Sequence, residues 1–343
     1  MSMNAPIALL ALLAPGLASA ASAGPAQSAL EPAGIQAARI HDLWLLTLGI
    51  CSLVFAAVLA GLVLALLRAR RSTAATPPDV TSLVRPEPRL KRNVLIAVGV
   101  STALLFGLVL ADVQTDRLLG RMPLTDAVHI ELTAHQWWWE ARYDNADASK
   151  IFTTANELHI PVGRPVILTL RSSDVIHTFW LPSLHGKKDM IPGRTSLIRL
   201  RADQAGAFRG QCAEFCGLEH AMMAFLVTAE DNKQYEAWAD AQRREASNVL
   251  DARQSRGRQV FMERSCVLCH TVQGIGANAV FGPDLTHVAS RQTLASGVLP
   301  NNRQQLAAWI TQPQKLKPGT NMPATSLSQE ELESLLAFID TLK

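Results

Sequence analysis

The sequence predicts a multidomain membrane protein with a two-helix transmembrane hairpin, then an all-β domain, then an all-α domain. Three observations predict this class. Two apolar stretches near the N-terminus carry no charge, short runs of alternating polarity begin near Val128, and helical patterns flank a Cys-Val-Leu-Cys-His sequence near the C-terminus. A chain of 343 residues is long enough for roughly two to three domains. The net charge of +3 gives no indication of a nucleic-acid partner.

Residues 1–23 have the pattern of a secretory signal peptide. An apolar core from Ile7 to Leu13 is followed by small residues that end in Ala18-Ser-Ala20 and Ala21-Ser-Ala23, as at a cleavage site. No lysine or arginine precedes the core, so a retained N-terminal segment is the alternative.

Residues 24–122 are predicted to form the transmembrane hairpin, with spans at about 43–67 and 94–111. Both runs are uncharged and reach the length needed to cross a hydrocarbon core of about 30 Å. The connection at 68–93 is rich in arginine and lysine, which places it in the cytoplasm by the positive-inside rule. The segments before and after the hairpin then lie outside the cytoplasm. In a bacterium, this places the hairpin in the inner membrane and both soluble domains in the periplasm. A buried hairpin in a soluble protein is the alternative.

Residues 123–230 are predicted to form an all-β domain of the sandwich or barrel type, because short strand patterns alternate with Gly, Pro and Asp. Strands are expected at 129–135, 157–162, 166–170, 196–200 and 224–228.

A short stretch of this domain, residues 212–223, is rich in metal-ligand side chains. It contains Cys212, Cys216, His220 and Met223, and His177 precedes it at an expected strand end. Thiolate, imidazole and thioether groups together favour copper, and two thiolates can bridge two copper ions. Three alternatives remain open on spacing alone: a disulfide, a structural zinc site, and one buried face of a helix.

Residues 231–254 are expected to be a helical connector, and residues 255–343 an all-α domain. Cys266-Val-Leu-Cys-His270 matches the pattern for covalent haem c, in which two thiols bind the haem and the histidine binds iron. A thioredoxin-like pair or half a zinc site is the alternative, but no βαβ pattern accompanies it. Met322 is the predicted second iron ligand. His287 and Arg291 are either contacts of the haem propionates or surface residues.

Four motifs resemble the cytochrome c oxidase subunit II family. They are Cys-Ala-Glu-Phe-Cys-Gly-x-x-His-x-x-Met at 212–223, Asp-Val-Ile-His-x-Phe-Trp at 174–180, Gly-Lys-Lys-Asp-Met-Ile-Pro-Gly-Arg at 186–194 and Gln-Trp-Trp-Trp at 136–139. The resemblance implies a cupredoxin-like Greek-key sandwich with the 212–223 stretch between its last two strands. The C-terminal region is similar to a class I cytochrome c domain, as in a caa-type oxidase.

The resemblance also implies roles for single residues. Cys212 and Cys216 would bridge two copper ions, and His177 and His220 would bind one copper each. Met223 and the carbonyl of Glu214 would be weak ligands, and the Glu214 side chain would reach magnesium or manganese at the subunit I interface. Trp137 matches the tryptophan through which electrons enter, Trp138 and Trp139 are expected to pack in the sandwich, and Met222 is expected to be packing.

The implied function is electron transfer from cytochrome c, or an upstream complex, through haem c and copper to haem in subunit I. Oxygen would be reduced to water there, with proton pumping, and the lipid bilayer and the other oxidase subunits would be partners. The alternatives are a membrane-tethered electron carrier and the copper subunit of a nitric oxide reductase. A quinol oxidase subunit is disfavoured by the intact ligand set.

One region departs from the family pattern. The family carries a glutamate in a Glu-x-x-Trp-Thr context before its second span, whereas residues 85–93 read Arg-Pro-Glu-Pro-Arg-Leu-Lys-Arg-Asn. Glu87 either neutralises a basic loop at the membrane surface or serves as a displaced group for proton uptake. The cations around it should lower its pKa.

Overall fold

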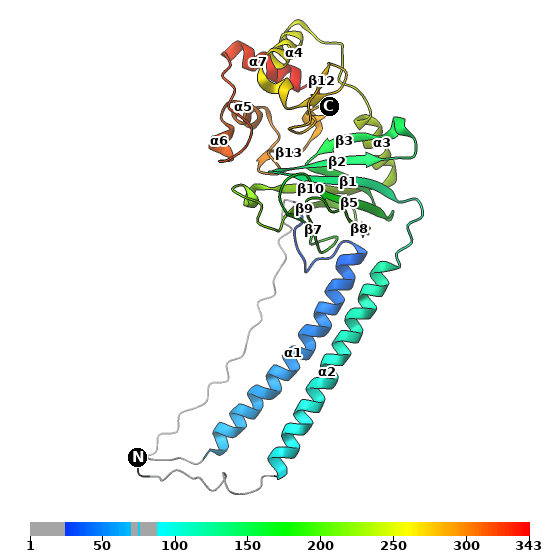
Figure 1. The fold of residues 1–343 in the computed structure, drawn as a ribbon, viewed down its shortest axis with the longest axis vertical. Helices are drawn as coiled ribbons and strands as arrows, with labels where there is room; N and C mark the ends of the chain where they lie inside the picture. The colour runs from blue at the N-terminus through cyan, green and yellow to red at the C-terminus, as the bar shows by residue number, and fades with distance from the viewer. Residues whose placement is uncertain (1–24, 70–74, 76–87) are drawn as a thin grey trace.

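The computed structural model describes residues 25–69, 75 and 88–343 (Figure 1). The predicted signal peptide and Glu87 lie outside these residues, as does most of the loop at 68–93. Two long helices project from one side of a β-sandwich, and a smaller helical domain lies on the opposite side (Figure 1).

The hairpin consists of α1 (Ile35–Arg68) and α2 (Pro88–Gly120). They have 34 and 33 residues, about 50 Å at 1.5 Å per residue, so each is longer than the predicted span inside it. Their apolar side chains, such as Phe55 and Leu105, are exposed along the middle of both helices. Length, composition and exposure together fit membrane-spanning helices.

The start of α1 is attached to the sandwich rather than free. The Ala33 amide donates to Ser183 O at 2.7 Å, and the Asp203 amide donates to Ala33 O at 2.8 Å. Gln36 is buried, and its Oε1 accepts from the Arg201 amide at 3.2 Å. A Cβ at Gly34 would lie 2.7 Å from Arg201 O, so only glycine permits this close approach.

The sandwich domain (residues 128–230) contains two five-stranded sheets, ordered β3-β2-β1-β5-β8 and β4-β10-β9-β6-β7. All predicted strands are present. The ten strands are β1 Val128–His135, β2 Trp138–Asp144, β3 Phe152–Ala155, β4 Glu157–Pro161, β5 Val166–Ser172, β6 His177–Trp180, β7 Lys187–Met190, β8 Ser196–Leu200, β9 Gly206–Cys212 and β10 Ala224–Glu230.

Strand pairing brings the ligand-bearing segments together. The β1–β5 and β10–β4 pairs are parallel, and the other pairs are antiparallel. Cys212, the last residue of β9, lies opposite Phe179 of β6, so His177 at the start of β6 is on the same face two residues away. The ring of Phe225 lies 5.0 Å from those of Trp139 and Phe179, which forms an aromatic core beneath this end.

The connector after the sandwich is only partly helical. Helix α3 (Asn232–Gln242) starts at Asp231, whose side chain caps it. The segment 243–251 is irregular, so the expected helix over 231–254 was too long. Trp238 of α3 stacks on His159 at 4.2 Å and packs edge-on against Tyr143, and these contacts fix α3 to the sandwich.

The C-terminal domain is built around two packed helices, α4 and α7 (Figure 1). A Cβ at Gly257 would lie 1.9 Å from Ser334 O, so the backbones of α4 and α7 meet there. Its helices and short strands are α4 Ala252–Glu263, β11 Thr271–Val272, β12 Ala277–Asn278, β13 Thr293–Leu294, β14 Leu299–Pro300, α5 Arg303–Thr311, α6 Pro313–Leu316 and α7 Gln329–Ile339.

The C-terminal domain is docked on the sandwich through buried polar contacts. The carboxylate of Glu157, which is 5% exposed, accepts from the amides of Gln292 and Thr293 and from the Thr293 hydroxyl at 2.8–3.0 Å. The Ala224 amide donates to Ser296 O at 3.0 Å, and the Ser296 hydroxyl donates to Trp137 O at 2.9 Å. Buried hydrogen bonds of this kind define one relative orientation of the two domains.

Candidate metal centre and cofactor site

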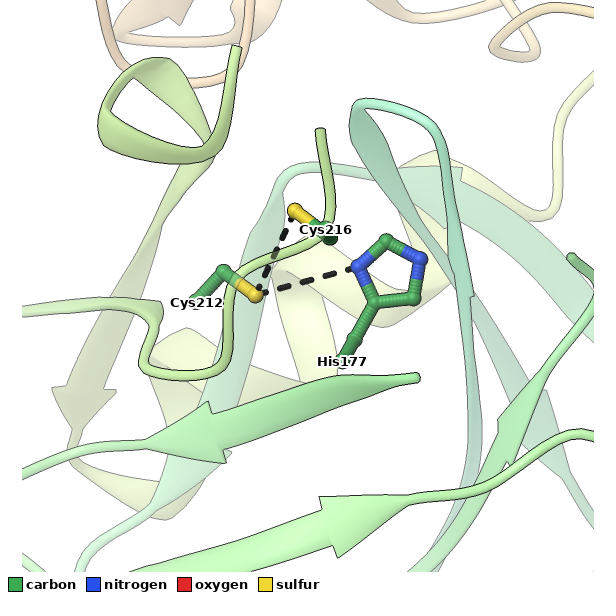
Figure 2. Close-up of side chains that lie close together, drawn as sticks. All are labelled: His177, Cys212 and Cys216. Carbon is green, nitrogen blue, oxygen red and sulfur yellow. Dashed lines mark hydrogen bonds between the residues drawn. The ribbon is translucent and has the colours of Figure 1, made fainter. Parts of the chain in front are cut away.

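The predicted metal ligands converge at one end of the sandwich. His177 comes from β6, and the others come from the ligand loop (residues 212–223) between β9 and β10. Cys212 Sγ lies 3.8 Å from Cys216 Sγ and 3.7 Å from His177 Nδ1 (Figure 2). Cys216 Sγ lies 3.6 Å from His220 Nδ1 and 3.9 Å from Met223 Sδ. His177, both cysteines and Met223 are buried, which excludes water from the cluster.

The ligand atoms are arranged for two ions rather than one. Among the described residues, the group whose ligand atoms all lie within 4.8 Å of one another is His177, Cys212 and Cys216, without His220. His177 approaches one sulfur and His220 the other. A single tetrahedral zinc ion would hold all four ligand atoms mutually close, whereas two thiolates shared by two ions place the histidines at opposite ends. This donor set fits a dinuclear copper centre.

The structure decides two of the alternatives drawn from spacing. Both cysteines are free thiols, and a sulfur separation of 3.8 Å is far longer than a disulfide bond. The ligand loop is irregular apart from the 3-10 helix η3 (His220–Met222), so one face of a buried helix was the wrong interpretation. Met222, expected to pack, is 36% exposed.

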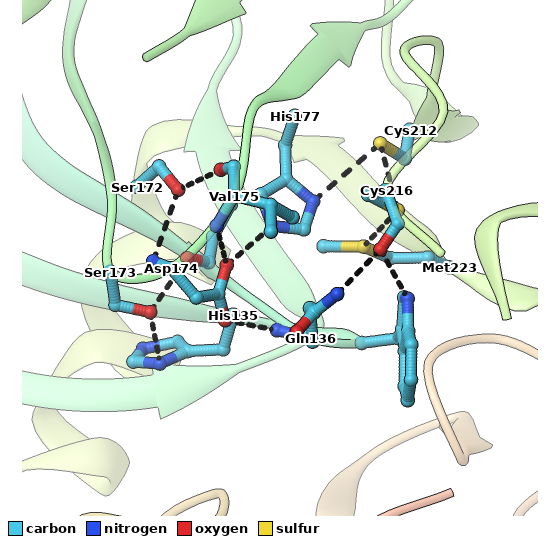
Figure 3. A network of polar contacts seen from close by, with 12 residues as sticks. His135, Gln136, Ser172, Ser173, Asp174, Val175, His177, Cys212, Cys216 and Met223 are labelled. Carbon is cyan, nitrogen blue, oxygen red and sulfur yellow. Dashed lines mark hydrogen bonds and ion pairs between the residues drawn. The ribbon is translucent and has the colours of Figure 1, made fainter. Parts of the chain in front are cut away.

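A carboxylate orients one of the ligands. Asp174 Oδ1 lies 2.8 Å from His177 Nε2 and accepts from the Val175 amide, while its Oδ2 accepts from the Gln136 amide at 2.7 Å (Figure 3). Burial acts to raise the pKa of Asp174, but these hydrogen bonds lower it overall. Burial acts to lower the pKa of His177, but Asp174 and the Cys212 sulfur raise it overall. The contact leaves His177 Nδ1 directed at the sulfurs.

The two thiols behave as a coupled pair. The contact between the two sulfurs lowers the pKa of Cys212, while the same contact and burial raise the pKa of Cys216. A cation binding at this site would displace thiol protons, because thiolates are the ligands that metals bind.

The remaining predicted residues of this site occupy distinct positions. Glu214 O lies 3.3 Å from Cys212 Sγ, while the Glu214 side chain is exposed. Trp137 is partly buried, and its Nε1 donates to Cys216 O at 2.9 Å. Trp139 is fully buried in the aromatic core, and Trp138 stacks on His135 at 4.2 Å, so both pack as expected.

The second candidate site lies in the C-terminal domain. Cys266 is in the 3-10 helix η4 (Ser265–Leu268), and the Cys269 and His270 amides donate to its carbonyl at 3.1 and 3.0 Å. His270 Nδ1 lies 2.8 Å from Pro283 O, and burial lowers the pKa of His270. A neutral imidazole with its proton on Nδ1 leaves Nε2 as a ligand. Met322 packs against the same core as Cys266.

The surroundings of His270 fit a large apolar cofactor. A Cβ at Gly282 would lie 2.8 Å from His270 Cε1, so the chain passes close to the ring there. Three apolar side chains near the motif are well exposed, at 67–83%: Leu268, Val280 and Phe281. Two thiols, a histidine presenting Nε2, and a methionine on the same core are the donor set for covalent haem with His/Met ligation.

His287 is not a surface residue. It is 3% exposed, and its ring nitrogens lie 2.9 Å from Lys343 O and 3.0 Å from Arg244 O, so it joins the connector to the C-terminus. Arg291 donates to Asp284 O, and among the described residues its buried Nε has no hydrogen-bond partner. Burial lowers the pKa of Arg291, and Glu157 and Asp284 offset part of that effect.

Sequence reasoning missed three residues that support these sites. Asp174 had a usable signal, because an acid three residues before a predicted ligand is placed to orient it. Gln136, whose Nε2 donates to Cys216 O at 2.7 Å, stands in the 136–139 motif but was given no role there. Lys317, whose Nζ donates to Trp137 O at 2.9 Å, had no such signal. Those contacts join residues 80 and 180 positions apart.

Two family profiles match the chain: "Cytochrome C oxidase subunit II, periplasmic domain" over residues 128–230 and "Cytochrome c" over residues 254–343. The chain is 37% identical to cytochrome c oxidase subunit 2 of Alkalihalophilus pseudofirmus, over 92% of this chain and 91% of the relative. It is 30% identical to that of Bacillus subtilis, over 73% and 71%. The solved periplasmic domain of the Bradyrhizobium japonicum subunit II is 29% identical, covers 34% of this chain and 92% of that chain, and has a TM-score of 0.32.

Proposed function

The chain belongs to the cytochrome c oxidase subunit II family, and we propose that it carries electrons from haem c on its C-terminal domain to copper on its sandwich domain. Members of this family are parts of a haem–copper oxidase, an oxidoreductase complex, and the apolar pair α1 and α2 anchors this one in a membrane. The observation that carries the proposal is the convergence of His177, Cys212 and Cys216 at one buried point, and the Cys216 carbonyl there is hydrogen-bonded to Gln136 and Trp137, which contact the C-terminal domain.

We assign the copper ligands by their contacts. Cys212 and Cys216 would both hold the two ions through their sulfurs, and His177 and His220 would each bind one ion through Nδ1. Met223 Sδ and Glu214 O lie next to the sulfurs as weak ligands. Asp174 holds the His177 ring in place throughout. Bound copper supplies a one-electron redox centre, and the buried sandwich end keeps water from it.

In the C-terminal domain, Cys266 and Cys269 would attach haem c, and His270 Nε2 and Met322 would bind its iron. Pro283 O fixes the proton on Nδ1 of His270, which keeps Nε2 available. A histidine–methionine pair gives haem c a high potential. Trp137 lies between the two sites, since its indole donates to Cys216 O and its carbonyl accepts from the C-terminal domain.

The remaining steps belong to the assembled oxidase. Haem c would accept electrons from cytochrome c or an upstream respiratory complex, and copper would pass them to haem in subunit I, where oxygen would be reduced and protons pumped. The exposed Glu214 carboxylate is free to bind magnesium or manganese with groups of subunit I. Both soluble domains lie on the periplasmic side of the bacterial inner membrane, opposite the basic 68–93 loop.

An optical and EPR spectrum of the purified complex tests this proposal. Haem c absorption together with a mixed-valence two-copper signal is the expected result, with a haem-bearing subunit I in the preparation. Haem c without the copper signal would contradict the copper assignment. A complex that reduces nitric oxide but not oxygen, or a chain that purifies without a large membrane subunit, would contradict the oxidase function.

A further inference from the structure

The C-terminal domain reaches the ligand loop through one irregular segment, the methionine loop (residues 317–322), which contains the proposed iron ligand Met322. We propose that Lys317 is a positioning residue whose buried ammonium group fixes this loop to the ligand loop for electron transfer between the two sites. The proposal rests on the proposed function and adds a residue that neither set of ligands contains.

Lys317 is buried between the two domains. Its side chain is 4% exposed, and its Nζ lies 3.1 Å from Glu219 Oε2 of the ligand loop, whose side chain is 1% exposed. The same Nζ donates to Trp137 O at 2.9 Å. Within the described part of the chain, the Glu219 carboxylate oxygens accept no hydrogen bond, so Lys317 is the charge that compensates this buried carboxylate. A buried charge without its partner is strongly unfavourable. The pair therefore restricts where the methionine loop can lie relative to the ligand loop.

A second contact continues from the same loop toward the metal site. Asn321 Nδ2 donates to Gln136 O at 3.1 Å, and Gln136 Nε2 donates to Cys216 O at 2.7 Å. Asn321 is next to Met322 in sequence, so a connection with two hydrogen bonds joins the proposed iron ligand to a proposed copper ligand. Electron transfer through hydrogen bonds is faster than transfer across an open gap, and a small displacement of the loop would break this connection.

Other contacts hold the domain but not this loop. Glu157 binds Gln292 and Thr293, and Ser296 binds Ala224 and Trp137, all outside residues 317–322. Within its own domain, the loop is shaped by Gln314, which accepts from the Gly319 amide at 3.0 Å. Across the interface, Lys317 and Asn321 provide its hydrogen bonds among the described residues. Loss of Lys317 should therefore displace the loop while the domain stays docked.

The test compares three variants of the complete oxidase: Lys317→Met, Lys315→Met and Glu157→Gln. Lys315 is the matched control because it is exposed and two residues away, and Glu157 controls for weakening the interface elsewhere. The measurements are the haem c-to-copper transfer rate after flash photoreduction, the potentials of both centres, and hydrogen exchange of residues 317–322. Lys317→Met should slow transfer about tenfold or more through misplacement, with faster exchange and unchanged potentials. Lys315→Met should stay within about twofold of wild type, because its side chain is exposed. Glu157→Gln, which weakens a docking contact outside residues 317–322, should slow transfer less than Lys317→Met and should not speed exchange of the loop.

A double variant, Lys317→Met with Glu219→Gln, keeps the test decisive if the single variant does not assemble, since it removes the unpaired buried charge. The double variant should assemble with the wild-type copper EPR signal, and electron transfer from haem c to copper should still be slow. Wild-type transfer and exchange in either variant would overturn the proposal, and so would slow transfer with an altered copper signal. Absence of haem-to-copper transfer in the unmodified oxidase would instead overturn the proposed function.

Discussion

The sandwich and C-terminal domains hold their sites in different ways. In the sandwich, β6, the end of β9 and a ligand loop that β9 and β10 hold at both ends bring the ligand atoms to within 4 Å of their neighbours. In the C-terminal domain, the short turn at Cys266–His270 and the methionine loop are irregular segments that lie beside the α4–α7 pair. Sheets fix ligands through backbone pairing, whereas irregular segments depend on a few specific contacts.

This difference matches the size of what each site binds. Small ions need ligand atoms near one point, which a twisted pair of sheets supplies with a rigid core. A large flat cofactor needs apolar walls from several segments, such as those that carry Leu268 and Phe281. The two domains should therefore respond separately to substitutions, and four predictions test that independence, from the largest expected effect to the smallest.

Cys216→Ser should remove the dinuclear centre and essentially all oxygen uptake, because a hydroxyl does not replace a bridging thiolate. Haem c should still be reduced by ascorbate, since its residues lie in the other domain. Oxygen uptake and haem reduction in the same preparation measure both effects. Cys51→Ser, at an exposed thiol in α1, is the control and should behave as wild type. Near-normal turnover of Cys216→Ser would refute the ligand assignment.

Gly257→Ala should unfold the C-terminal domain alone. The added Cβ would lie 1.9 Å from Ser334 O, and a backbone atom on a packed helix cannot move aside. We therefore expect the free energy of unfolding of this domain to fall by about 3 kcal/mol or more. Thermal melting followed by haem absorbance measures this loss, and the copper EPR signal should persist. Gln259→Ala, at an exposed position of the same helix, should melt like wild type. Loss of the copper signal in parallel would show that the domains do not fold independently.

Asp174→Asn should weaken copper binding by about 10–100-fold, the range for partners that orient a metal-bound histidine. Haem c content should not change. Copper retention against a chelator, followed by EPR, measures this effect. Asp203→Asn serves as the control, because Asp203 is exposed and pairs with Arg201 away from the ligand loop. Equal copper retention in both variants would show that the sandwich alone positions His177.

Glu331→Gln should produce the smallest change, a reduced acid sensitivity of the C-terminal domain. A hydrogen bond from the Ser328 amide, assisted by Arg264, lowers the pKa of Glu331 from 4.5 to about 2. Because the folded state favours the ionised form, its contribution to stability is present above pH 4.5 and is lost as pH falls toward 2. Melting followed by haem absorbance gives the melting temperature at pH 5 and at pH 3. The drop in melting temperature between these two pH values should be smaller by a few degrees in the variant than in the wild type. Glu330→Gln, at an adjacent exposed position, should keep the wild-type difference.

The sequence by itself determined the order of the domains and the residues that carry the chemistry. Two uncharged runs predicted α1 and α2, because a bilayer requires length and apolarity that are visible locally. Strands with one buried face, such as β1 and β5, were found by their alternation. The spacing of the cysteines and histidines indicated a metal site and a haem site, because one short segment of the chain holds most of each ligand set.

Tertiary structure decided what depends on distant residues. It placed His177 beside the Cys212 sulfur and His220 beside the Cys216 sulfur, outside the tight group of the other three ligands, which favours two ions over one zinc ion. It ended α3 at Gln242, although a helical composition continues to Gln254. It also buried Lys317 against Glu219, although a lysine before Pro-Gly reads as an exposed turn residue. Such contacts join segments almost 100 residues apart, and their energies come from burial, which no local pattern records.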